Sequence, residues 1–186
     1  MAPTVDPLSP DALARVRAGE RDAFEPLFRV WYPRLAEYAA RLLGNRDAAE
    51  DAVQDVFVAV WSRHASLPEA SKLAAYLHRA VRNRALNQLR HQRTAGRWLA
   101  QVEADPAVAA VAETSLEHAE LEGALRAALA DLSPRVREVF QLSRDQGLTY
   151  PEIADTLGIS VKTVETLMGR ALRALRSRLA ARLESG

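Results

Sequence analysis

A stretch near the C-terminal end brings together side chains that bind phosphates and base edges. On a helix that starts after Ser160, one exposed face would present Lys162, Thr163, Thr166, Arg170 and Arg173. Lysine and arginine neutralise backbone phosphates, and threonine hydroxyls reach base edges in the major groove. The chemistry predicted for this face is therefore recognition of duplex DNA.

The segment 149–176 has the local signals of a helix-turn-helix, the motif that places such a face in the groove. Thr149 and Glu152 form a capping box for the first helix, Gly158 suits the turn, and Ser160 is a good N-cap for the second helix. Small and apolar residues are expected on the inner side: Ala154, Val164, Leu167, Met168, Ala171, Leu172 and Leu175. The alternative is a helical hairpin with a solvated outer face.

The composition narrows the class of protein. The 186 residues include no cysteine and four scattered histidines, so disulfides and thiol catalysis are excluded and neither a metal site nor a cofactor is expected. No stretch approaches the roughly 18 apolar residues of a membrane span, and the first residues, MAPTVDPLSP, lack the pattern of a secretory signal. We expect a soluble, cytoplasmic protein with a short disordered tail at residues 1–9.

The net charge of +1 conceals a segregation of charge along the chain. Residues 70–102 contain seven Lys or Arg and no acid, whereas residues 100–123 contain six acids and no Lys or Arg. From residue 161 onward, six basic residues and two acids give 6 − 2 = +4. Two basic segments separated by an acidic one predict two contacts with a polyanion.

Every strongly periodic segment has the helical period, so we predict an all-α protein with two small helical domains joined by an acidic linker. The first domain is expected at 10–96, the linker at 97–114 and the second domain at 115–183.

Four helices are expected in the first domain. The first begins at Ser9, the second runs over about 22–43, the third is capped by Asn45 or Asp47, and the fourth runs over 72–93. Four helices are expected in the second domain, with starts marked by Thr114, by Ser133 and by the helix-turn-helix.

The helix expected at 72–93 has a polar stripe within one quadrant: Tyr76, Arg79, Asn83, Asn87 and Arg90. Amides bond to base edges, arginines bind phosphate, and a tyrosine can stack on an unstacked base. Arg84 is expected to turn toward the inner side, with only its stem buried. The alternative is a solvated face with no role in binding.

An acidic patch is expected on the preceding helix, formed by Asp51, Gln54 and Asp55 beside Glu50. The helix dipole favours acids near an N-terminus, which explains part of the patch. Catalysis and metal binding are disfavoured because no histidine, serine nucleophile or glycine-rich phosphate loop accompanies it. A basic protein partner is the better interpretation, and the patch should face away from DNA.

Three blocks, in this order, resemble the extracytoplasmic-function group of RNA polymerase sigma factors, the smallest members of the sigma-70 family. AAEDAVQDVFVAVW at 48–61 is similar to region 2.2, which docks on the clamp coiled coil of the polymerase's largest subunit. LAAYLHRAVRNRALNQLRHQR at 73–93 looks like regions 2.3 and 2.4, which open the promoter and recognise the −10 element. Residues 132–176 resemble region 4, whose helix-turn-helix recognises the −35 element and touches the polymerase flap.

The resemblance implies roles for individual residues. It implies docking on the polymerase by Asp51, Gln54 and Asp55. Asn83 matches an asparagine that holds open the junction where duplex becomes single strand. Tyr76 stands where the family usually has tryptophan, and Asn87 where it usually has aspartate, which puts the common −10 preference in doubt. The base-facing positions of region 4 hold Lys162, Thr163, Thr166 and Arg170.

The function implied by the resemblance is transcription initiation, without enzymatic activity. Such a protein binds core RNA polymerase and directs it to promoter DNA, and an anti-sigma factor is its expected regulator. The main alternative is a regulator of the response-regulator or quorum-sensing output type, whose DNA-binding module the C-terminal block also resembles. A receiver domain would need alternating strands and helices, whereas residues 10–96 predict helices alone. An enzyme acting on nucleic acid would need a catalytic constellation that the sequence lacks.

Overall fold

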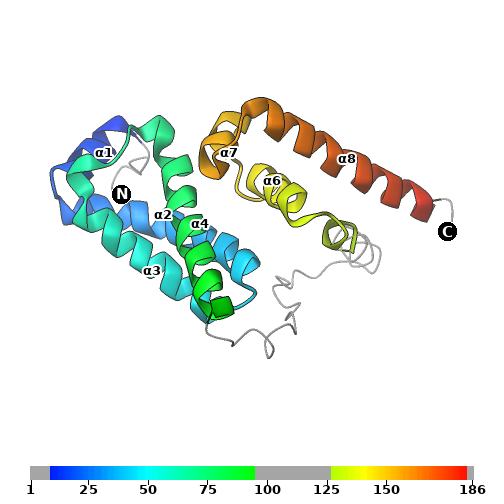
Figure 1. Cartoon of the computed structure of the whole chain (residues 1–186). Helices are drawn as coiled ribbons and strands as arrows, with labels where there is room; N and C mark the ends of the chain where they lie inside the picture. The colour runs from blue at the N-terminus through cyan, green and yellow to red at the C-terminus, as the bar shows by residue number, and fades with distance from the viewer. Residues whose placement is uncertain (1–8, 95–126, 184–186) are drawn as a thin grey trace. The chain divides into compact units, whose positions relative to one another are not determined.

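The computed structural model describes residues 9–94 and 127–183, and every regular element in these ranges is a helix (Figure 1). The chain divides into two compact units between Asp105 and Pro106. The prediction of an all-α protein with two small helical domains is confirmed. Within the described ranges, no helix combines the length and the apolar character needed to cross a membrane.

Several sequence-based predictions fall outside the described residues. These concern the tail at 1–8, the linker at 97–114 and most of the helix expected after Thr114. Only residues 127–130 of that helix are described, and they are helical.

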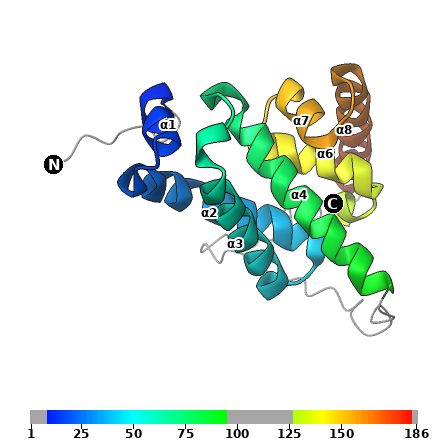
Figure 2. The ribbon, with the colours of Figure 1, turned by 60° about the vertical axis from the view of Figure 1, so that its left-hand side comes forward.

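The first unit is a group of helices that cover one another's apolar sides. Its elements are α1 (Pro10–Arg17), α2 (Arg21–Leu43), α3 (Arg46–Ser62), the short 3-10 helix η1 (His64–Ser66) and α4 (Ala70–Thr94). Helices α2, α3 and α4 contact one another pairwise, while α1 contacts α2 and η1 (Figure 2).

Local capping signals set where these helices begin and end. The Ser9 hydroxyl accepts a hydrogen bond from the Ala12 N–H at 3.1 Å, so α1 begins as predicted. Helix α2 ends at Gly44, whose φ of 66° is left-handed and therefore suits glycine. Of the two caps considered for α3, the structure selects Asn45, whose side chain accepts from the Ala48 N–H at 2.9 Å.

The core of the first unit is apolar, with one polar side chain at its centre. Its fully buried members include Leu27, Leu35, Tyr38, Val53, Leu73, Leu77, Val81 and Ala85. His78 is also fully buried, with its ring centroid 5.8 Å from that of Trp31 and 5.4 Å from that of Tyr38. Its Nδ1 lies 2.9 Å from the Ala74 carbonyl oxygen, so the ring nitrogen donates to the preceding helical turn. This hydrogen bond satisfies one polar atom of an imidazole that the sequence analysis did not place in the core.

Aromatic residues of α3 belong to this core as well. Phe57 is 3% exposed and lies edge-on to Phe28, with ring centroids 4.8 Å apart. Trp61 is half-buried against Phe24 at 5.0 Å. Both aromatic residues of the 48–61 block therefore pack against α2.

The second unit contains α6 (Pro134–Arg144), α7 (Tyr150–Leu157) and α8 (Val161–Leu183). Helix α6 contacts both α7 and α8. Arg137 fixes the start of this unit because its guanidinium donates to the carbonyls of Leu129 at 2.8 Å and Leu132 at 3.1 Å. These bonds connect α6 to the end of the helical residues 127–130 and to the turn that follows them.

We predict that Leu77→Ala lowers the free energy of unfolding of the first unit by about 2–5 kcal/mol, because Leu77 is fully buried and its truncation leaves a cavity. Urea denaturation of the full chain, followed by tryptophan fluorescence, measures the change. Val58→Ala is the matched control: Val58 is 67% exposed, so the value should change by no more than about 0.5 kcal/mol. Equal effects of the two substitutions would contradict a stabilising role for this buried side of α4.

Candidate nucleic-acid and protein interfaces

The helix-turn-helix predicted at 149–176 is present, with its caps in place. Thr149 and Glu152 form the capping box, in which the Thr149 N–H donates to Glu152 Oε2 at 2.8 Å. Gly158 ends α7 with a φ of 63°, and Ser160 Oγ accepts from the Thr163 N–H at 3.1 Å. The chain therefore turns sharply between α7 and α8 and starts the second helix with a satisfied backbone donor.

Burial of one side of α8 determines which side chains remain outside. Val164 and Ala171 are fully buried, and Met168 is 2% exposed, as the predicted inner stripe requires. All five side chains proposed for DNA contact are exposed: Lys162, Thr163, Thr166, Arg170 and Arg173. The Thr166 hydroxyl donates to the Lys162 carbonyl at 2.9 Å, which leaves its oxygen lone pairs free to accept from a base.

A buried polar contact that the sequence analysis missed connects α6 to the end of α7. Arg135 Nη2 donates to the Leu157 carbonyl oxygen at 3.1 Å, and Arg135 Nη1 donates to Glu138 Oε2 at 3.2 Å. The Glu138 side chain is 9% exposed and that of Arg135 35%, so the carboxylate is shielded from water while the guanidinium is half-buried. The hydrogen bond from Arg135 to the Leu157 carbonyl connects α6 to the last turn of α7, directly before the turn that leads into α8. The i, i+3 spacing was visible in the sequence, but the partner carbonyl 22 residues away was not.

The polar stripe of α4 adjoins its apolar side. Leu73, Leu77, Val81 and Ala85 are fully buried, while Tyr76 is half-buried. The remaining stripe residues are exposed: Arg79, Asn83, Asn87 and Arg90. Within the stripe, Arg90 Nη1 donates to Asn87 Oδ1 at 3.0 Å. The structure thus places these residues where a nucleic acid could reach them.

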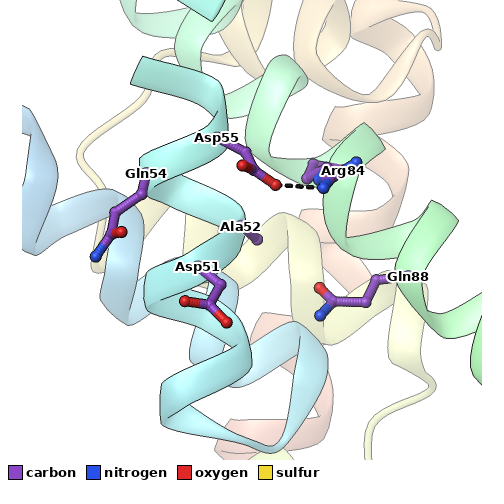
Figure 3. Close-up of a pocket in the computed structure, with 6 residues that line it drawn as sticks. All are labelled: Asp51, Ala52, Gln54, Asp55, Arg84 and Gln88. Atoms are coloured by element: carbon purple, nitrogen blue, oxygen red, sulfur yellow. Dashed lines mark hydrogen bonds and ion pairs between the residues drawn. The ribbon is translucent and has the colours of Figure 1, made fainter. Parts of the chain in front are cut away.

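The acidic patch of α3 lines a groove between α3 and α4. Figure 3 shows the groove residues, namely Asp51, Ala52, Gln54, Asp55, Arg84 and Gln88. The cavity volume is about 290 Å³. Asp51, Gln54 and Asp55 are exposed, as a surface for a protein partner requires. Among the described residues, Asp51 and Gln54 have no hydrogen bond or ion pair, so their polar groups are available to a partner.

Arg84 leans toward α3, as a side chain on the inner side of α4 should, but the sequence did not identify its partner. The side chain is 54% exposed, and its Nη2 donates to Asp55 Oδ2 in an ion pair (Figure 3). A helical wheel gives only the direction in which a side chain leaves the backbone, and the long arginine stem reaches across to a carboxylate on α3. The acidic patch consequently adjoins α4 instead of lying on a separate side of the unit.

Comparison with known proteins identifies the family. The model of sigma-70 region 2 matches residues 27–95, and the model of sigma-70 region 4 matches residues 122–175. The sigma factor CarQ of Myxococcus xanthus is 32% identical over 167 residues, covering 90% of this chain and 95% of that protein. The extracytoplasmic-function sigma factor SigW of Bacillus subtilis is 27% identical over 179 residues, covering 90% of this chain and 94% of that protein.

Solved structures agree with this result. CnrH in complex with the cytosolic domain of CnrY matches with a TM-score of 0.65 and 28% identity, over 94% of this chain and 98% of that one. The sigma factor RpoE of Bartonella quintana, in complex with the anti-sigma factor NepR, matches with a TM-score of 0.68 and 26% identity, over 84% of this chain and 96% of that one. The chain belongs to the extracytoplasmic-function group of the sigma-70 family.

We predict that Gly158→Ala destabilises the helix-turn-helix by about 1–2 kcal/mol, because a side chain at a left-handed φ of 63° is strained even where open space surrounds it. Gly169→Ala is the matched control. Gly169 lies inside α8, and an added Cβ would meet only Arg173 Nη1 at 3.6 Å, so alanine should stabilise the helix by about 0.5–1 kcal/mol. Amide hydrogen exchange across α7 and α8 measures both changes. A stabilising effect of Gly158→Ala would refute the assigned turn.

Proposed function

We propose that this protein binds core RNA polymerase and directs it to specific promoters, with each helical unit recognising one promoter element. The observation that carries the proposal is the order of two matched regions on one chain, region 2 before region 4, each with an exposed polar face. In this function, residues 10–96 form the region 2 domain, 97–114 the linker and 115–183 the region 4 domain.

Recognition of the −35 element is proposed for α8. Its exposed residues after a tight turn suit the major groove, where Arg170 and Arg173 neutralise phosphates and Lys162, Thr163 and Thr166 approach base edges. Glu165 is also exposed on this helix and would repel phosphates close to it. The groove contact therefore depends on the basic residues that surround this acid.

Opening of the −10 element is proposed for the stripe of α4. Bases flipped from the stack must be unpaired and unstacked, at a cost of a few kcal/mol, and their exposed faces and edges then need partners. The half-buried Tyr76 supplies a ring for stacking, and Asn83 and Asn87 supply amides for hydrogen bonds. Arg79 and Arg90 supply positive charge for the backbone.

Docking on the polymerase is proposed for Asp51, Gln54 and Asp55 of α3. Two carboxylates one helical turn apart attract a basic surface, and the clamp coiled coil of the largest subunit is the partner that region 2.2 implies. The flap is the corresponding partner of region 4. The action is binding alone, without catalysis or a cofactor, and it takes place in the cytoplasm where promoters and polymerase are found.

Control by an anti-sigma factor is part of the proposal. Two solved relatives support it, since RpoE is held by the anti-sigma factor NepR and CnrH is bound to the cytosolic domain of CnrY. A regulator of the output-domain type is not favoured. The region 2 model matches 27–95, and the described residues 9–94 contain helices where a receiver domain would have alternating strands.

Transcription in vitro with core RNA polymerase and a promoter library tests the function. We predict start sites that share −35 and −10 motifs and that depend on this protein. Asn83→Ala and Arg170→Ala should each reduce transcription from these sites by about tenfold, which corresponds to the loss of one good base or phosphate contact. Arg29→Ala is the control because Arg29 is exposed on α2 and forms an ion pair with Glu25, one helical turn before it. Duplex binding by the protein without core binding or new start sites would instead support an output-domain regulator.

Binding to core polymerase tests the docking surface separately. We predict that Asp51→Asn weakens the affinity of the full chain for core polymerase by about three- to tenfold at low salt, and by less at high salt, because the contact is between exposed charges. Asp22→Asn is the control, since it removes the same charge from an exposed position on α2. The same loss in both variants would mean that only net charge matters.

A further inference from the structure

The two docking carboxylates of α3 differ in one respect. Asp55 is ion-paired with Arg84 of α4, whereas Asp51, one helical turn earlier, has no ion pair or hydrogen bond among the described residues (Figure 3). Both partners of the Asp55 pair are slightly more than half exposed, at 53% for Asp55 and 54% for Arg84. An incoming cation can therefore reach Asp55, but only in competition with Arg84.

Arg84 also borders the stripe of α4. It is three residues before Asn87, and side chains three apart on a helix are surface neighbours. It directly follows Asn83 in the chain. Its guanidinium is turned toward α3 by the pair with Asp55, so in the free chain this positive charge is held on the acidic side of the groove and away from the stripe.

The groove leaves room for the Arg84 side chain to move. The groove is open, about 290 Å³ in volume, and Gln88 lies across from Asp51 (Figure 3). Among the described residues, Arg84 has Asp55 as its one recorded partner, so no second hydrogen bond holds the guanidinium in place. An exposed pair of this kind contributes little to stability and is weakened by salt. Replacement of Arg84 by another cation at Asp55 therefore costs little free energy.

We propose that Arg84 is an internal counter-ion of the docking surface, which a basic side chain of the polymerase replaces at Asp55. The released guanidinium then joins Asn87 and Arg90 on the stripe and binds a promoter phosphate. The inference rests on the proposed function, and it makes docking on polymerase and binding of DNA mutually dependent through one side chain.

The test measures the affinity of the full chain for core RNA polymerase at low salt, for Arg84→Gln, Asp55→Asn and the double variant. Arg84→Gln should tighten binding by up to about fivefold, the fold-change equivalent to a surface ion pair of about 1 kcal/mol. In the Asp55→Asn background the same substitution should leave the affinity unchanged. Arg29→Gln is the matched control, because it removes one arginine charge and one exposed ion pair on α2.

The sign of the change decides between two roles of Arg84. If Arg84→Gln weakens core binding, or leaves it unchanged, the competition is refuted and Arg84 instead supports the docking surface or is neutral to it. Equal tightening in the Asp55→Asn background, or by Arg29→Gln, likewise refutes it, because the effect would then be one of net charge. If Asp51→Asn and Asp55→Asn both leave core affinity unchanged, the docking surface itself is wrong, which is a failure of the proposed function.

The second step has its own readout. With preformed holoenzyme on a promoter fragment, the slope of log affinity against log salt concentration counts phosphate contacts. Arg84→Gln should reduce the magnitude of this slope by about 0.7–0.9, the value of one contact. An unchanged slope would refute the transfer of Arg84 to DNA.

Discussion

The first unit depends on the burial of one side of α4. Leu73, Leu77, Val81 and Ala85 are completely excluded from solvent in a unit where α4 contacts α2 and α3, and their spacing of four residues fixes which side of the helix faces inward. Rotation by one residue would bring charged side chains into the core. The outward direction of the polar stripe is therefore a consequence of packing, and the proposed DNA contacts need no further element to orient them.

In the second unit, both packing and polar contacts orient the helix that carries the proposed DNA contacts. The helix α8 is oriented by the buried Val164, Met168 and Ala171, and the short α7 buries Ile153, Ala154 and Leu157. Polar contacts complete the arrangement: the capping box begins α7, and Arg135 bonds to the Leu157 carbonyl at its end. A left-handed glycine then redirects the chain. Because these bonds are largely within α6 and α7, the face of α8 stays free for a ligand.

Features set by neighbouring residues were predictable from the sequence. The capping box and the Gly44 and Gly158 stops depend on contacts within about four residues, and the apolar stripes of α4 and α8 repeat every three or four residues, so these patterns are visible in the sequence. The Arg84–Asp55 pair and the Arg135 contact, neither of which was foreseen, both join residues more than 20 positions apart. A long, flexible arginine chooses among partners that only the fold brings near, and periodicity contains no information about that choice.

The distribution of charged side chains over the surface is more informative than the net charge of the chain. Acids and bases nearly cancel over the whole chain, yet α3 presents exposed carboxylates and the adjacent α4 presents arginines and amides. An acidic surface and a basic surface this close together would each weaken the attraction of the other for its own partner. The Arg84–Asp55 pair lies at their boundary, where it neutralises one charge of each sign. If a cation of the polymerase displaced Arg84 from Asp55, as proposed, that balance would change on both helices, and the two surfaces would respond together.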